Sequence, residues 1–164
     1  MIRSEVNNKL REFARSLSPT ERERETVSKV YSSLQEILGK NKCIQIGSYP
    51  RYTAITPIHD LDILYVIGEW SDNNDLQDPE YALDEVKELV RSSYANYCPN
   101  GYSYRVDVQN HSVVIELKGE AEFSVDIVPC YEWSKNEYDD YMYKVPEVIK
   151  VKDHSERKNT YWNP

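Results

Sequence analysis

The segment spanning residues 43–67 reads CIQIGSYPRYTAITPIHDLDILYVI, and its pattern decides the fold. Its first four residues predict a short strand, and Gly47-Ser48 predicts a turn directly after that strand. Residues 60–67 predict a second strand that is almost entirely apolar after its two aspartates, which is typical of a strand buried on both faces. The segment therefore predicts two strands, with a glycine–serine turn ending one and a pair of acidic residues opening the other.

Asp60 and Asp62 are two residues apart on the second predicted strand, so their carboxylates point to the same face. Two like charges in a poorly solvated place repel each other and raise the pKa of one of them. We expect a cation to compensate this pair, and Mg²⁺ prefers carboxylate oxygens together with waters and substrate phosphates. The alternative is structural: Asp60 faces water at a strand end, and Asp62 pairs with an arginine such as Arg51 or Arg105.

A third carboxylate interrupts a later apolar segment. Phe123, Val125 and Ile127 fall on one face of this predicted strand, and Asp126 points to the other. If the two strands are neighbours, three carboxylates converge, and such a site can hold two metal ions that clamp the attacking and leaving oxygens of a phosphoryl transfer. Asp107 is a weaker candidate for the third position because it ends a strand beside a turn, where solvation is easier. The non-catalytic alternative places Asp126 in a buried ion pair.

The Gly47-Ser48 turn is a candidate phosphate site. A glycine at a strand end allows a ligand to approach the backbone closely, and turn N–H groups can form an anion site beside the serine hydroxyl. A Gly-Ser pair alone is a weak signal because most such pairs are plain turns. Its position between two strands, followed by Asp-x-Asp, is what favours a role in binding.

Two helices are predicted before this segment. The first has an apolar stripe at helical spacing, expected to be core, formed by Val6, Leu10, Phe13 and Leu17. We expect Ser18 to cap the second helix, with Pro19 at its first position and Glu21 completing a capping box. Gly39 is placed where a glycine commonly ends a helix.

The remaining sequence predicts a surface loop, one helix and three strands. Asp78 can cap a helix that begins at Pro79. Apolar or alternating runs at 102–108, 113–117 and 122–128 are joined by connections short enough for hairpins, which predicts an antiparallel meander. The order of elements predicts an α+β fold, a mixed sheet with the N-terminal helices packed on one side.

The tail from residue 131 onward is polar and tyrosine-rich, with little periodicity. It ends with Tyr161 and Trp162, two aromatic residues for which no core is evident. They indicate either a missing partner or a segment that folds back onto the domain.

The bulk composition is that of a soluble globular domain of 164 residues. No apolar run approaches the roughly 20 residues needed to span a bilayer, and the N-terminus lacks the apolar segment of a signal peptide, so we expect a cytoplasmic protein with no membrane partner. The net charge of −8 argues against long nucleic acid as a partner because phosphate binding needs a basic face. The three cysteines and three histidines lack metal-ligand spacing, and no Gly-x-x-x-x-Gly-Lys loop occurs, which argues against a zinc site and a P-loop enzyme.

The combination of the Gly47-Ser48 turn, the strand with Asp60-x-Asp62 and the later Asp126 resembles the signature of the DNA polymerase β-like nucleotidyltransferase superfamily. Within it, residues 47–57 look like those of the CD-NTases, bacterial relatives of cyclic GMP-AMP synthase and oligoadenylate synthase that make cyclic oligonucleotide second messengers in anti-phage defence. The resemblance is strong over residues 44–67 and good over 123–129. Tyr52 is a departure, because relatives commonly carry glycine at this position. Its ring either narrows the phosphate loop or points outward.

The resemblance implies a twisted mixed sheet flanked by helices, and a helical C-terminal domain that closes the nucleotide cleft and is absent from residues 1–164. It assigns metal binding and catalysis to Asp60, Asp62 and Asp126. It assigns nucleotide binding to Gly47, Ser48, Arg51 and Thr53. It also implies Mg²⁺ or Mn²⁺ as cofactor, NTPs as substrates, and an activator that the sequence does not identify. We therefore expect the catalytic core of a larger enzyme that joins NTPs to a ribose hydroxyl, releases pyrophosphate and synthesises a cyclic oligonucleotide.

Two alternatives stay open at this point. One is a linear or RNA-end nucleotidyltransferase, which the acidic charge argues against. The other is a catalytically inactive nucleotide-binding or antitoxin-like module, which the retention of all three carboxylates argues against.

Overall fold

The computed structural model describes residues 2–70, 78–119, 122–150 and 157–162. Its helices are α1 (Ile2–Leu17), α2 (Glu21–Leu38) and α3 (Pro79–Ser93), with short 3-10 turns at Lys40–Lys42 and Tyr94–Asn96. Its strands are β1 (Cys43–Ile46), β2 (Asp60–Glu69), β3 (Ser103–Val108), β4 (Val113–Lys118), β5 (Glu122–Lys135), β6 (Tyr141–Lys150) and β7 (Arg157–Trp162). The α+β class predicted from the sequence is confirmed.

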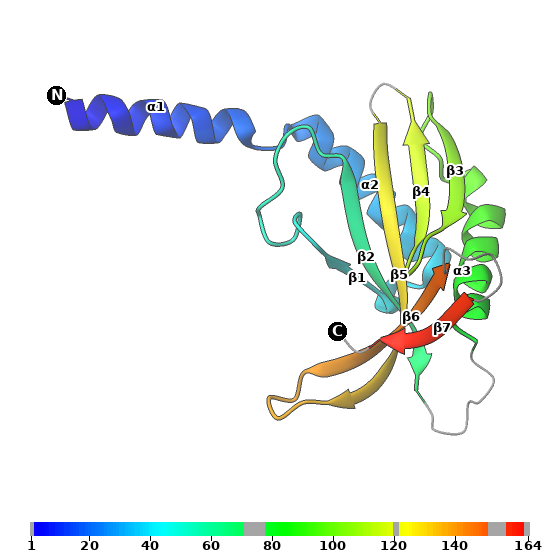
Figure 1. Ribbon diagram of the computed structural model, residues 1–164. Helices are drawn as coiled ribbons and strands as arrows, with labels where there is room; N and C mark the ends of the chain where they lie inside the picture. The colour runs from blue at the N-terminus through cyan, green and yellow to red at the C-terminus, as the bar shows by residue number, and fades with distance from the viewer. Residues whose placement is uncertain (1, 71–77, 120–121, 151–156, 163–164) are drawn as a thin grey trace.

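The strands form a mixed sheet (Figure 1). Five of them follow the order β1-β2-β5-β4-β3, while β6 pairs with β5 and β7 pairs with β6. β2 and β5 run parallel, and the other neighbouring pairs are antiparallel. The predicted meander is confirmed as β3, β4 and β5, and its last strand lies beside β2 in the centre of the sheet.

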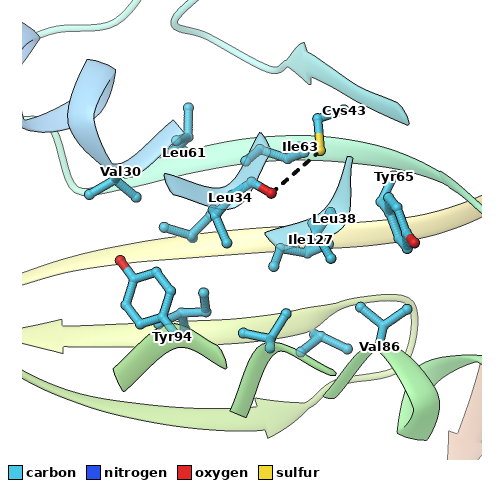
Figure 2. Packing of buried hydrophobic residues seen from close by; sticks show 14 of the residues in the cluster. Val30, Leu34, Leu38, Cys43, Leu61, Ile63, Tyr65, Val86, Tyr94 and Ile127 are labelled. Atoms are coloured by element: carbon cyan, nitrogen blue, oxygen red, sulfur yellow. Dashed lines mark hydrogen bonds between the residues drawn. The ribbon is translucent and has the colours of Figure 1, made fainter. Parts of the chain in front are cut away.

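One face of the sheet is covered by α2 and α3, as Figure 1 shows. Figure 2 shows Leu34 of α2 and Val86 of α3 packed over Ile63 of β2 and Ile127 of β5. Leu34, Ile63 and Ile127 are each 0% exposed. Burying an aliphatic side chain of this size contributes about 1.5–3 kcal/mol, so each of these residues helps to hold the helices on the sheet. The helices predicted on one side are confirmed for α2, and α3 joins it there.

The opposite face of β2 is more open than its apolar sequence suggested. Leu64 and Val66 on that face are half-buried, whereas Leu61 and Ile63 on the helix-covered face are 1% and 0% exposed. The expectation of a strand buried on both faces is therefore wrong. No helix covers this second face in the described part of the chain.

The apolar stripe of α1 does not join the core. Val6, Leu10 and Phe13 are 49%, 60% and 62% exposed, so their prediction as core residues is wrong. Figure 1 shows that α1 extends away from the sheet and the other helices. The stripe has the predicted helical spacing, but only Leu17 at its end is half-buried, and its carbonyl accepts a hydrogen bond from the Thr56 N–H.

α2 begins two residues later than predicted. Its N-cap is Thr20, whose side chain accepts a hydrogen bond from the Glu23 N–H, and the Glu23 carboxylate accepts one from the Thr20 N–H. The predicted cap at Ser18 and the predicted capping box with Glu21 are therefore wrong. Thr20 and Glu23 have the same sequence spacing, and they form the capping box instead. The predicted end of the helix at Gly39 is confirmed, with φ +104° at that residue.

The tail is ordered as strands rather than irregular. β5 continues to Lys135, and β6 and β7 then extend the sheet. The Tyr161 ring lies 4.8 Å from the Trp70 ring and 6.0 Å from the Tyr131 ring, and the Trp162 backbone pairs with Val145. Of the two interpretations of the terminal aromatic residues, the described part of the chain supports the fold-back.

The helices of the described residues are all too short or too polar to cross a lipid bilayer. The three cysteines form no disulfide, and Cys43 and Cys130 are buried.

Candidate active site

β2 presents its two acidic side chains on the open face of the sheet. Leu61 and Ile63 point into the core, and side chains alternate along a strand, so Asp60 and Asp62 point the other way. Asp60 is exposed at the start of the strand, and Asp62 is half-buried. The prediction that the two carboxylates share one face is confirmed.

Asp126 lies directly beside Asp62. β2 and β5 are parallel neighbours, and their register pairs Asp62 with Asp126 and Asp60 with Ser124. Paired residues on adjacent strands lie on the same face, with the strands about 4.8 Å apart. The structure thus brings together the three acidic residues that the sequence singled out from two distant segments.

Asp60, Asp62 and Asp126 together form an acidic row on this face of the sheet. The local electrostatics disfavour three negative charges in this row. Burial raises the pKa of the Asp62 carboxyl, and the neighbouring Asp60 raises it further. Burial also raises the pKa of Asp126, with the charges of Asp62 and Asp60 adding to the effect. Since the charged forms are disfavoured by both burial and mutual repulsion, a bound cation would be stabilised here.

The structural alternative of ion pairing is not supported for these aspartates. Within the described ranges, none of the salt bridges includes Asp60, Asp62 or Asp126. Arg105, one of the suggested partners, instead pairs with Asp107 at 2.6 Å. Three neighbouring carboxylates with no ion-pair partner among the described residues are the pattern expected where a ligand supplies the positive charge.

Asp107, the rival for the third position, faces the same side of the sheet. The register pairs Asp107 with Val114 and Val114 with Asp126, so Asp107 is two strands away from Asp126. Its ion pair with Arg105 already balances its charge. The geometry therefore favours Asp126 over Asp107.

The Gly47 turn lies against Asp62. Ile46, the last residue of β1, pairs with Asp62, and Gly47 follows with φ +77°. A Cβ atom at position 47 would overlap the Asp62 carboxylate, and this φ is one that other residues rarely adopt. Only glycine therefore brings the turn backbone this close to the acidic row.

The turn after Gly47 is closed by Thr53. Both the N–H and the hydroxyl of Thr53 donate to the Ser48 carbonyl, at 3.0 and 3.1 Å. Arg51 is exposed on the same turn. Tyr52 has φ +58°, and its side chain is 96% exposed, so the ring points outward and does not narrow the loop. A left-handed backbone at residue 52 also explains why glycine suits this position.

The three aspartates do not form a closed metal site in the described part of the chain. Among the residues that the structure describes, no group of three His, Cys, Asp or Glu side chains stands in metal-holding geometry. A cavity of about 240 Å³ lies elsewhere, beside Thr20, Glu23, Ile58 and Phe123, and none of the three aspartates lines it. Asp60 is exposed and Asp62 and Asp126 are half-buried on the face of the sheet that α2 and α3 leave uncovered.

Glu23 is a residue near this site that the sequence reasoning missed. Its carboxylate accepts hydrogen bonds from the Thr56 hydroxyl and from the Ile58 N–H, which is two residues before Asp60. The capping motif Thr20-x-x-Glu23 was a signal for its local role. Its contact with a segment more than thirty positions away had no sequence signal.

A family model and solved structures resemble this chain. The model of the Second Messenger Oligonucleotide or Dinucleotide Synthetase domain matches residues 5–150. The CD-NTase CdnG of Bradyrhizobium diazoefficiens, solved with GTP, has a TM-score of 0.60 and 15% identity, and the match covers 91% of this chain and 41% of that one. CdnC of E. coli MS115-1, in complex with HORMA-deltaN, has a TM-score of 0.54 and 20% identity over 93% of this chain and 46% of that one.

A third similar structure is the CdnE cyclic dinucleotide synthase of Elizabethkingia meningoseptica with GTP and Apcpp, at a TM-score of 0.50 and 17% identity, over 94% of this chain and 54% of that one. The chain spans about half the length of these solved structures. No curated protein sequence matches it. At such identities the structural likeness shows the fold, while the family match over residues 5–150 covers most of the sequence. The chain therefore belongs to the Second Messenger Oligonucleotide or Dinucleotide Synthetase domain family and has the polymerase β-like nucleotidyltransferase fold of the CD-NTases.

Proposed function

We propose that the chain is the catalytic core of a metal-dependent nucleotidyltransferase that converts NTPs into a cyclic oligonucleotide, acting in the cytoplasm in anti-phage defence. The observation that carries the proposal is the pairing of Asp62 with Asp126 on parallel strands, with Asp60 on the same face and the Gly47 turn against Asp62. The family match supports the second-messenger product.

Asp60, Asp62 and Asp126 would hold Mg²⁺ or Mn²⁺. Carboxylate oxygens are the ligands that these hard cations prefer. Burial, followed by the charge of the neighbouring aspartates, raises the pKa values of Asp62 and Asp126, and a bound cation would offset both effects. When bound, the metal neutralises the triphosphate and lowers the pKa of the attacking hydroxyl.

The remaining groups hold the substrate and move the proton. The Gly47-Ser48 backbone and the Ser48 hydroxyl bind the β- and γ-phosphates, with Thr53 fixing the turn and Arg51 supplying positive charge at its surface. The ribose hydroxyl oxygen forms a bond to the α-phosphorus as the bond to pyrophosphate breaks, and pyrophosphate leaves. Asp126 accepts the hydroxyl proton.

The test is incubation of the protein with the four NTPs and Mg²⁺ or Mn²⁺, followed by mass spectrometry of the products. We expect a cyclic product that disappears on chelation and in Asp126→Asn. Asp107→Asn is the matched control, since Asp107 faces the same side two strands away, and we expect it to stay active. Linear products would overturn cyclisation, and full activity of Asp126→Asn would remove Asp126 from its role.

Calorimetry with a non-hydrolysable NTP separates binding from turnover. We expect Mg²⁺-dependent binding to the wild type and largely retained binding to Asp126→Asn. Tight binding without metal and without any product would identify a nucleotide-binding module instead of an enzyme.

A further inference from the structure

The Glu23 carboxylate joins two segments that are far apart in the sequence. It accepts hydrogen bonds from the N–H and the hydroxyl of Thr20, at 2.6 and 2.7 Å, which cap α2. It also accepts from the Thr56 hydroxyl and from the Ile58 N–H, both at 2.9 Å. Four donors thus converge on one side chain, two from the start of α2 and two from the segment that leads into Asp60.

This leading segment is fixed at successive residues. The Thr56 N–H donates to the Leu17 carbonyl at 2.9 Å, and the Ile58 side chain is 7% exposed. The His59 carbonyl accepts from the Ser124 N–H of β5 at 2.8 Å. The backbone therefore enters Asp60 already tied to α2 on one side and to β5 on the other.

The chemistry of the four donors requires a carboxylate. A glutamine can serve a capping box, since one acceptor oxygen is enough there. Here both carboxylate oxygens accept, and a glutamine would direct its own NH₂ donors at one pair of donors. Burial acts to raise the pKa of Glu23, but the hydrogen bonds from Thr20, Ile58 and Thr56 bring it down to about 2, so it is ionised at neutral pH.

We propose that Glu23 is a positioning residue for the reaction: by holding Thr56 and Ile58, it sets where Asp60 stands relative to Asp62 and Asp126. This inference rests on the proposed function, because it assumes that the three aspartates act together on a cation. Glu23 contacts neither the aspartates nor a substrate in this role. It acts through the two residues it binds.

The test uses Glu23→Gln and Thr56→Val. Thr56→Val removes the hydroxyl that donates to both Glu23 carboxylate oxygens, at 2.9 and 3.0 Å, and leaves the cap of α2 intact. The control is Ser32→Gly on the exposed side of α2, which weakens the helix without touching Glu23. We call the hydrogen bonds from Thr56 and Ile58 to the Glu23 carboxylate the clamp, and hydrogen exchange of the Ile58 amide measures its strength. Electron paramagnetic resonance measures Mn²⁺ binding to the acidic row. Steady-state kinetics give kcat and KM.

We expect both clamp variants to weaken Mn²⁺ binding and lower kcat by about 10-fold, the lower end of what partners of metal ligands usually contribute. The KM for NTP should change little, since the hydrogen bonds of Glu23 reach Thr20, Thr56 and Ile58 and not the Gly47–Thr53 turn. Ile58 exchange should accelerate in Glu23→Gln. Ser32→Gly should lose stability but keep Mn²⁺ binding and kcat.

Faster exchange at Ile58 with unchanged Mn²⁺ binding and kcat would overturn the positioning role and leave the proposed function intact. The positioning role would also be overturned if Ser32→Gly, at an equal loss of stability, lowered kcat as much as Glu23→Gln and Thr56→Val do. A wild type that binds no Mn²⁺ would overturn the proposed function, and the positioning role with it. If Glu23→Gln does not fold, Thr56→Val decides the question alone.

Discussion

Gly47 lies so close to Asp62 that a single added carbon at residue 47 would overlap the Asp62 carboxylate. The backbone at Gly47 is also left-handed, with φ +77°. The glycine thus serves two demands at once, the turn and the close approach of that turn to the acidic row.

Gly47→Ala should consequently cost both stability and activity. We expect a loss of about 1–3 kcal/mol in the free energy of unfolding, the usual cost of a forced overlap, together with a large loss of turnover because Asp62 must move. Urea unfolding and product formation check the two effects. Gly68→Ala is the control, since no atom lies within 4 Å of its added Cβ. Equal behaviour of the two variants would contradict the close-approach argument.

Asp126→Asn should stabilise the metal-free protein. Because the pKa of Asp126 is raised in the folded state, the ionised carboxylate opposes folding at neutral pH, and removing its charge relieves that cost. We expect a gain of about 0.5–2 kcal/mol, the usual size of a single stabilising substitution, and a smaller stabilisation by Mn²⁺ than in the wild type. Thermal unfolding with and without MnCl₂ measures both, with Asp107→Asn as reference. A variant that Mn²⁺ still stabilises like the wild type would refute the assignment.

The pH dependence of stability should reveal Glu23. Its folded pKa of about 2 lies below the unfolded value, so its stabilising contribution is complete above about pH 5 and is lost as the pH falls toward 2. Glu23→Gln should be less stable than the wild type by about 1–3 kcal/mol at neutral pH, and the gap should narrow with acidification. Urea titrations at several pH values test this. A gap independent of pH would show that the carboxylate charge does not matter.

Tyr52→Gly should be tolerated. Tyr52 is held at φ +58°, a region that costs a side-chain-bearing residue about 1–2 kcal/mol, while the greater freedom of glycine in the unfolded chain returns part of that gain. We expect unchanged or slightly higher stability, and full activity because the ring is 96% exposed. Tyr52→Val is the contrasting variant and should destabilise. Loss of activity in Tyr52→Gly would show that the ring contacts substrate.

Substitutions on α1 and α2 should differ sharply. Phe13→Ser should change the free energy of unfolding by no more than about 0.5 kcal/mol because Phe13 is 62% exposed. Leu34→Ala should cost about 2–5 kcal/mol because Leu34 is 0% exposed. Chemical denaturation of this chain measures both. A comparable loss in Phe13→Ser would mean that α1 packs in solution.

The sequence predicted those features that depend on neighbouring residues. The period of two in β2 and β5 put Asp60, Asp62 and Asp126 on polar faces, and Asp78 with Pro79 marked the start of α3. Alternation along one strand does not say which strand lies beside it. The sequence alone therefore does not predict that β2 and β5 are parallel neighbours, which the structure shows.

Features decided by distant contacts were missed. Ser18 and Thr20 both fit the capping motif, but Thr20 is the residue that caps α2. Its partner Glu23 also accepts hydrogen bonds from Thr56 and Ile58, which local sequence does not reveal. The spacing of the α1 stripe is that of a core helix, but spacing cannot supply a surface to pack against. The strands β6 and β7 lacked a clear period.

The register between β2 and β5 ties folding accuracy to the geometry of the proposed active site. A slip of one residue would turn Asp126 toward the helix layer and expose Val125 or Ile127, both of which are 0% exposed in the observed pairing. A misaligned form would therefore be destabilised in two ways. The Asp126 carboxylate would be buried in the apolar core, and the aliphatic contacts of Val125 and Ile127 would be lost. Selection for a filled interior is, in this protein, also selection for an aligned pair of aspartates.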